Sequence, residues 1–182
     1  CAGIVAASGT MTGVAPGATL LAYKVLDSNG YGSISGMIAG MERAADPDQD
    51  PATDDEVDII SMSLGYAGTP GDPWSLAVRA AADQGILVAV AAGNSGPGYG
   101  DLDSPGLEAK AFTVGASDKG DMIALFSSRG PVPGYPDLIK PDIVAPGVEI
   151  VSTWLNGGYA SADGTSMATP HVAGAAALVW QA

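Results

Sequence analysis

The chain is 182 residues long, 47% of its residues are hydrophobic, and its formal net charge is −13. This length and apolar content suit one folded domain with a sizeable core and argue against disorder. Because the excess of acidic residues would repel a nucleic-acid backbone or an anionic membrane surface, neither is expected as a partner. The longest apolar runs are far shorter than the roughly 20 residues that cross a bilayer, and a single cysteine excludes an internal disulfide.

Five short apolar runs predict strands, and two segments between the first three of them predict helices. The runs are rich in β-branched residues and bounded by Gly, Pro or Asp, as buried parallel strands would be. We expect strands at 19–26, 57–64, 86–92, 111–117 and 148–153, and helices at 33–45 and 73–85. The helical segments repeat apolar residues every three or four positions, and the second ends at a glycine. This alternation predicts an α/β fold with a parallel sheet and right-handed crossovers.

Two long loops and a final helix complete the predicted elements. Residues 93–110 and 118–147 are rich in Gly, Pro, Asp and Ser, which is typical of loops, and loops at the carboxyl ends of strands are where a site is expected. The final helix is expected to start with Thr165 as its N-cap. Ser166 would then lie in the first turn, where free N–H groups and the positive end of the helix dipole stabilise an oxyanion. Pro170 has no N–H and would free a carbonyl near Ser166.

Ser166 is either a nucleophile or simply a residue that favours helix starts, and its own stretch leaves both interpretations open. His171 is the single histidine of the chain. It lies five residues further on, about 140° around the helix and about 7.5 Å along its axis. Its ring therefore cannot hydrogen-bond the Ser166 hydroxyl as a base must. We expect His171 to be a structural residue packed under the helix.

Three sequence blocks together resemble the subtilase family of serine peptidases. They are ISMSLG at 60–65, AAGNSG at 91–96 and GTSMATPHVAG at 164–174. The similarity continues through GVAPGATLLAYKVL, FSSRGP and KPDIVAPG, so that it covers nearly the whole chain. The resemblance implies one peptidase domain over 1–182 with a three-layer, subtilisin-like fold: a mostly parallel central sheet with helices on both faces. It also implies an endopeptidase that hydrolyses peptide bonds through an acyl-enzyme on a serine.

The resemblance assigns roles to particular residues. Ser166 matches the nucleophile, and Asn94 matches the asparagine whose side-chain amide donates to the oxyanion. By its own context Asn94 is better explained as a turn residue after a strand. Substrate would lie extended between Ser63, Leu64 and Gly65 on one side and Gly30, Tyr31 and Gly32 on the other. The wall of the first subsite would include Ala91, Ala92 and Gly93, whose small side chains favour a large apolar residue and broad specificity.

The family's catalytic aspartate and histidine precede the segment that this chain matches. The histidine motif has the form H-G-T-H-x-A-G, and the chain opens on CAG, which aligns with the last three positions. The resemblance therefore predicts a fragment that lacks the general base, is cut within its last helix, and is inactive alone. Cys1 resembles the cysteine of the thiol-bearing subtilases, where it is expected to pack beneath the histidine.

Two other functions compete with the peptidase. A non-catalytic peptide-binding or scaffold module would keep the fold without a base, and the residues before Cys1 would decide this. An α/β-hydrolase esterase requires G-x-S-x-G, whereas Ser166 lies in G-T-S-M-A. For the peptidase, polypeptide substrates and an N-terminal prodomain or protein inhibitor are the expected partners, and the resemblance implies secretion.

An acidic loop, DPDQDPATDDEVD at 46–58, is the remaining feature. Asp46, Asp48 and Asp50 resemble the start of an oxygen-rich calcium loop, but Pro51 and Val57 stand where an EF-hand needs glycine and glutamate. The loop is either a solvated charge run or a structural calcium site. No cofactor is expected for catalysis.

Overall fold

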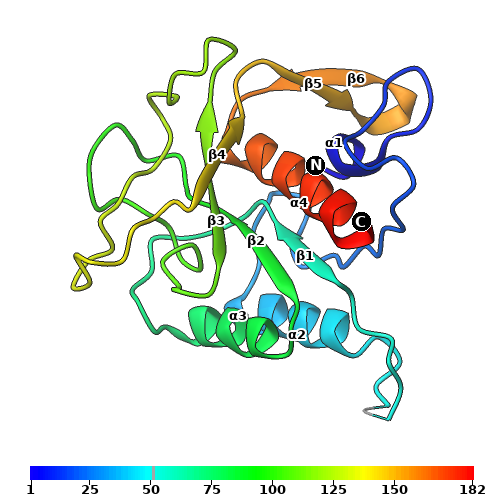
Figure 1. Ribbon diagram of the computed structural model, residues 1–182, viewed down its shortest axis with the longest axis horizontal. Helices are drawn as coiled ribbons and strands as arrows, with labels where there is room; N and C mark the ends of the chain where they lie inside the picture. The colour runs from blue at the N-terminus through cyan, green and yellow to red at the C-terminus, as the bar shows by residue number, and fades with distance from the viewer. Residues whose placement is uncertain (51) are drawn as a thin grey trace.

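The computed structural model describes residues 1–50 and 52–182 and places a parallel sheet between two helical layers (Figure 1). The sheet has the order β1 (Ile59–Met62), β2 (Leu87–Ala91), β3 (Phe112–Ser117) and β4 (Ile143–Pro146). One layer consists of α2 (Ile34–Ala45) and α3 (Pro73–Asp83), and the other of α4 (Thr165–Gln181) with the short α1 (Ala2–Ala6) beside it. The predicted three-layer α/β fold, with helices on both faces of the sheet, is therefore confirmed.

The helix boundaries follow from local sequence. Ser33 caps α2 by accepting a hydrogen bond from the N–H of Gly36 (3.0 Å), and Asp72 caps α3 by accepting one from the N–H of Ser75 (2.9 Å). Gly85, two residues beyond α3, adopts a φ of 96° that suits a helix end. Among the described residues, no helix is both long enough and apolar enough to cross a membrane.

The expected first strand, 19–26, is not a strand in the structure. Leu20 and Leu21 are 47% and 54% exposed. A cavity of about 870 Å³ lies between this segment and β1 and is lined from both sides, for example by Tyr23 and Ile60. A strand needs a neighbour at about 4.8 Å to pair its backbone groups. The expectation is wrong: the segment has strand-like residues, but among the described residues it pairs with no strand.

The end of the sheet also differs from the expectation. The run at 148–153, expected as a buried parallel strand, forms β5 (Ile150–Thr153), which pairs antiparallel with β6 (Tyr159–Ala162) in a separate sheet. A short 3₁₀ helix, η1 (Leu155–Gly157), joins the two strands. The fourth strand of the main sheet is instead β4, which lies within the loop expected at 118–147. A short apolar run does not distinguish a buried strand from one strand of a hairpin, so sequence pattern alone misassigned both.

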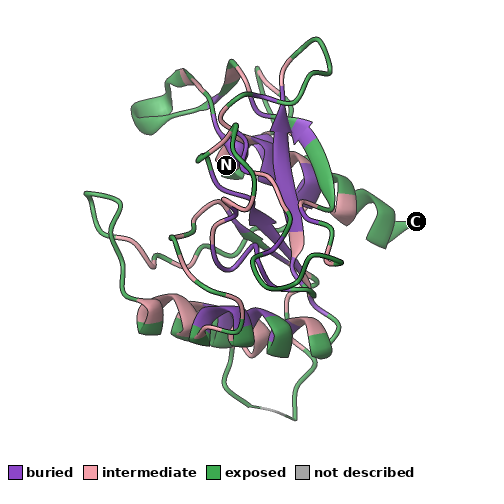
Figure 2. Cartoon of the chain, turned by 90° about the vertical axis from the view of Figure 1, so that its left-hand side faces the viewer, coloured by how far each residue is buried: buried purple, intermediate pink, exposed green. Residues whose placement is uncertain are grey.

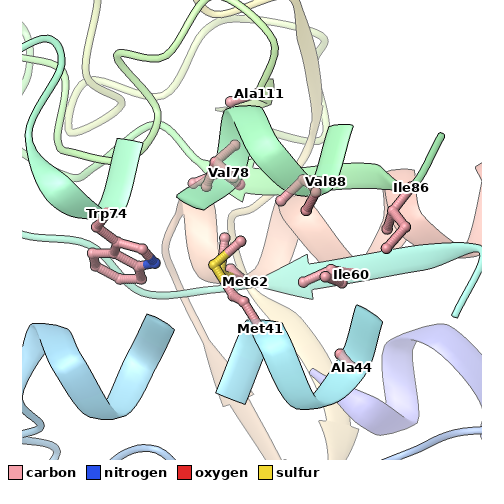
Figure 3. Packing of buried hydrophobic residues seen from close by; sticks show 11 residues of the cluster. Met41, Ala44, Ile60, Met62, Trp74, Val78, Ile86, Val88 and Ala111 are labelled. Carbon is pink, nitrogen blue, oxygen red and sulfur yellow. The ribbon is translucent and has the colours of Figure 1, made fainter. Parts of the chain in front are cut away.

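Buried apolar side chains fill the spaces on both sides of the sheet. On the side of α2 and α3 they include Met41, Ala44, Ile60, Met62, Trp74, Val78, Ile86 and Val88 (Figure 3). On the side of α4 the residues are smaller: Val114, Ala116, Ala124, Ala145, Ala168 and Val172. Figure 2 shows the buried residues gathered in the sheet and on the inner sides of the helices. Small side chains let α4 lie close to the strands, which fixes the start of α4 relative to the strand ends.

The packing of α4 can be tested at Val114 of β3, which is 0% exposed and contacts the cluster containing Ala168 and Val172. We expect Val114→Ala to lower the free energy of unfolding by about 2 kcal/mol, because it removes buried methyl groups and leaves a cavity. Urea unfolding followed by circular dichroism measures this loss. The matched control is Val179→Ala on α4, at a side chain that is 77% exposed. Equal losses at the two positions would contradict the packing.

Candidate active site

Ser166 lies in the first turn of α4, as the sequence predicted, but the cap of this helix is different. The N-cap is Gly164, and Thr165 is the first helical residue. Gly164 has a φ of 147°, a conformation that is strained for residues with a side chain. The Thr165 hydroxyl does not cap its own helix, because it is bonded to Gly93 O at 3.3 Å and Asn94 Oδ1 at 3.1 Å. The expected capping role of Thr165 is therefore wrong, and its fully buried hydroxyl instead ties α4 to the end of β2.

Asn94 is brought directly to the start of α4. Its side-chain Oδ1 accepts a hydrogen bond from the backbone N–H of Thr165 at 2.9 Å, next in sequence to Ser166. Because the oxygen faces the helix, the orientation of the amide is fixed and its Nδ2 group remains a donor. Among the described residues, no hydrogen bond uses that Nδ2 group, and Asn94 is exposed. An amide held in this way can donate a hydrogen bond to an anion at the N-terminus of α4.

Ser63 forms a second link to the start of α4, at Ser166. Ser63 Oγ donates to Ser166 O at 2.8 Å, and Ser166 Oγ donates to Ser63 O at 3.2 Å. In a regular helix the N–H of residue 170 would bond Ser166 O, but Pro170 has none. The prediction that Pro170 frees a carbonyl near Ser166 is therefore consistent with the structure, in which Ser63 takes up the freed group. Sequence reasoning missed this role of Ser63, since Pro170 indicates a free carbonyl but not its partner.

No general base contacts Ser166 within the described part of the chain. The hydroxyl donates to Ser63 O, a backbone carbonyl that cannot accept the proton in a reaction. His171 is half-buried, and its Nδ1 lies 2.8 Å from Met167 O of its own helix. Cys1 Sγ lies 3.4 Å from Ser166 O, so the thiol contacts the backbone of Ser166. These contacts agree with a structural role for His171.

The two segments expected to flank a substrate both reach the surface near one apolar cluster. Gly65 is exposed. Leu64 packs against the buried cluster that contains Trp74, and Ile34 at the start of α2 packs against the same cluster. Tyr31, just before α2, is exposed, and its N–H donates to the Asp27 carboxylate at 2.9 Å. The hydrogen bonds from Tyr31 and Asn29 hold the pKa of Asp27 below its usual range. Residues 30–32 are thus held in a defined turn.

The expected wall of the first subsite is mostly buried. Ala91, Ala92 and Gly93 form the end of β2 and the residues after it. The side chain of Ala92 packs in a small core with Leu102 and Leu107. The wall would therefore face a ligand chiefly through its backbone and Gly93. Next to Gly93 lies the carboxylate of Asp103, a residue that sequence reasoning did not single out.

The acidic loop gathers two of its three expected ligands and one other residue. Oxygens of Asp46, Asp48 and Asp55 lie within 4.8 Å of one another. Asp50 is outside this group, and its Oδ1 accepts a hydrogen bond from the N–H of Ala52. Pro51, the mismatch to the EF-hand pattern, lies outside the described residues. Asp46 Oδ1 is buried without a hydrogen-bond partner among the described residues.

Comparisons with known proteins agree with the sequence motifs. The sequence model of the subtilase family matches residues 1–182. Serine protease AprX of Bacillus subtilis (strain 168) is 41% identical over 212 aligned residues, which cover 100% of this chain and 47% of AprX. Subtilisin Savinase of Lederbergia lenta is 43% identical over 93% of this chain and 56% of its own length. The chain thus spans about half the length of the curated relatives it matches.

Solved structures give the same result for the fold. Sphericase superimposes with a TM-score of 0.84 at 40% identity, covering 98% of this chain and 61% of the sphericase chain. A cold-adapted subtilisin-like serine proteinase superimposes with a TM-score of 0.81 at 35% identity, over 99% of this chain and 59% of its own. The subtilisin-like fold expected from the motifs is therefore confirmed.

The link between Ser63 and Ser166 can be tested by removing the donor. We expect Ser63→Ala to lower the free energy of unfolding by about 1 kcal/mol, because Ser166 O loses its hydroxyl partner. In a Pro170→Ala background the restored N–H can bond the same carbonyl, so Ser63→Ala should then cost less. Urea unfolding of the four proteins completes the cycle, with Ser161→Ala on exposed β6 as the control. The same cost in both backgrounds would contradict the assignment.

Proposed function

The chain belongs to the subtilase family, and from this membership we propose that Ser166 is the nucleophile and Asn94 the oxyanion donor of a serine endopeptidase. The observation that carries the proposal is the hydrogen bond from the N–H of Thr165 to Asn94 Oδ1 (2.9 Å). It holds a free amide donor beside the serine at the start of a helix. The names of the relatives, serine protease and subtilisin, support the same reaction class.

The proposed chemistry uses the groups around the first turn of α4. Ser166 Oγ attacks the carbonyl carbon of a peptide bond, and negative charge develops on the carbonyl oxygen. Asn94 Nδ2 and the N–H of Ser166, which has no acceptor within the helix, donate to that oxygen. The positive end of the helix dipole favours the same charge. The peptide nitrogen then leaves with a proton, the acyl group remains on Ser166, and water releases it.

We propose that the general base comes from outside these 182 residues. The proton of Ser166 Oγ needs an acceptor, and His171 is engaged with Met167 O on its own helix. In the family, a histidine oriented by an aspartate takes this proton and passes it to the leaving nitrogen. The 182 residues alone would then be inactive, because a serine without a base is a weak nucleophile.

The remaining family expectations are part of the proposal. Polypeptides are the proposed substrates, held extended between residues 30–32 and 63–65 by main-chain hydrogen bonds. A prodomain or protein inhibitor would occupy the same groups as an extended chain. Secretion is proposed from family membership.

The reaction can be tested by substitution in the full-length protein with a peptide substrate. Ser166→Ala should abolish both hydrolysis and labelling by a phosphonyl fluoride. Asn94→Ala should lower kcat about 10²–10³-fold with KM little changed, which is the loss known for the corresponding donor of subtilisin, a member of the same family. Ser161→Ala, an exposed serine on β6, should leave both unchanged.

The outcomes separate the peptidase from a non-catalytic module. Hydrolysis that survives Ser166→Ala would refute the nucleophile assignment. A full-length protein that binds peptides but neither cleaves them nor reacts with the label would favour the scaffold function. The 182-residue chain alone should not be labelled, and rapid labelling would contradict an external base.

We also propose a structural calcium ion in the acidic loop. Carboxylate oxygens are the ligands that calcium prefers, and the buried, unpartnered Asp46 Oδ1 beside Asp48 and Asp55 fits such an ion. Calcium at about 100 times its Kd should stabilise the protein by about 2.7 kcal/mol, seen as a rise in Tm. Asp48→Asn should remove most of the rise. Asp50→Asn, with the same charge change outside the group, should keep it, and an unchanged Tm in the unsubstituted protein would exclude the site.

A further inference from the structure

Asp103 lies where the chain after β1 meets the chain after β2. Its backbone N–H donates to Ala92 O at 2.9 Å. The next residue, Ser104, exchanges two backbone hydrogen bonds with Tyr66, at 2.9 and 3.0 Å. Residues 103 and 104 therefore link Tyr66, which directly follows the expected substrate-flanking segment Ser63–Gly65, to Ala91–Gly93, the expected wall of the first subsite.

The side chain of Asp103 occupies the space between two glycines of these segments. A Cβ at Gly93 would lie 2.6 Å from Asp103 Oδ2, and a Cβ at Gly65 would lie 3.1 Å from Asp103 Cβ. Gly93 has a φ of 108°, so the backbone also restricts this position to glycine. The carboxylate thus lies directly against the residue that precedes Asn94. Since Gly93 belongs to the expected wall of the first subsite, the carboxylate lies beside the place where that subsite would hold a substrate side chain.

The Asp103 carboxylate has no cation and no hydrogen-bond donor among the described residues. The four ion pairs of the described chain are Arg79–Glu108, Lys110–Asp83, Lys119–Glu149 and Lys140–Asp142. Burial raises the pKa of the Asp103 carboxyl, and the charge of nearby Asp101 raises it further. Because Asp103 is only partly buried, a ligand can still reach its oxygens. A cation supplied by a ligand would offset the cost of this half-buried charge.

The structure of the loop does not account for this aspartate. Aspartates in loops usually accept hydrogen bonds from nearby backbone N–H groups. Asp101 does so, with the N–H of Arg129 at 2.7 Å, and Asp118 does so with Gly120 and Met122. Asp103 accepts no such bond among the described residues. Its carboxylate is therefore available to a ligand.

We propose that Asp103 selects peptides with arginine or lysine at the residue whose carbonyl Ser166 attacks. This inference rests on the proposed peptidase function, and it replaces the expected apolar preference of the wall formed by Ala91, Ala92 and Gly93. A guanidinium or ammonium group at the end of a long side chain would pair with the carboxylate beside Gly93. The net charge of −13 would also attract cationic peptides.

The test uses the full-length protein and tetrapeptide coumarin amides that differ only in the residue before the cleaved bond. We expect kcat/KM to be at least tenfold higher for arginine or lysine than for phenylalanine. Asp103→Asn should lower kcat/KM about 10- to 100-fold for the basic substrates, as expected for the loss of one charged hydrogen bond. It should leave kcat/KM for the phenylalanine substrate unchanged. Asp101→Asn, with the same charge change two residues away, should keep the preference.

A binding measurement separates this inference from the peptidase function. In a Ser166→Ala background, product peptides ending in arginine should bind more tightly than those ending in phenylalanine, and Asp103→Asn should abolish the difference. If the full-length protein cleaves nothing but binds with this pattern, the proposed function fails and the role of Asp103 stands. If cleavage and binding both favour phenylalanine, or if the ratio is unchanged by Asp103→Asn, the role of Asp103 is refuted.

Discussion

The start of α4 is held by side chains from the ends of two neighbouring strands, and the candidate site depends on this attachment. Asn94, after β2, accepts from the N–H of Thr165, while Ser63, after β1, donates to the carbonyl of Ser166. Parallel neighbours in a sheet end at the same edge, so two loops far apart in sequence reach the same helix turn. Every helix leaves the N–H groups of its first turn without a partner inside the helix, and in α4 two of these groups have different roles. One N–H, that of Thr165, holds Asn94 in place, and the next, that of Ser166, would donate to the proposed oxyanion.

The sequence allowed α2, α3, α4 and the middle strands of the sheet to be predicted, but not which segments form the edge strands of the sheet. Helices α2 and α3 carry their own caps in Ser33 and Asp72, so local sequence is sufficient for them. A strand depends on a partner that local sequence does not reveal. For that reason the sequence did not reveal that 19–26 is unpaired or that 148–153 pairs in a hairpin outside the main sheet.

The residues of the candidate site that stand in a motif were predictable from the sequence. Those whose role depends on contacts between distant segments were not. Ser166 and Asn94 stand in recognisable blocks, and the structure brings them to the same helix turn. The partner of the carbonyl freed by Pro170 was not predictable, because Ser63 lies 103 positions away. Asp101 and Asp103 look alike in the loop sequence, yet one bonds a backbone N–H and the other is unpaired among the described residues. Only the folded arrangement distinguishes a structural aspartate from an available one.

The cavity beside β1 has a consequence for how these 182 residues would join the rest of the full-length protein. β1 is the outermost strand of the main sheet, and on its open side the cavity separates it from residues 19–26. Its backbone N–H and C=O groups on that side therefore form an open edge, flanked by the exposed Leu20 and Leu21. Such an edge is a template for a further strand, and because the chain spans about half the length of the curated relatives it matches, a segment of the full-length protein outside these 182 residues would be a partner for it.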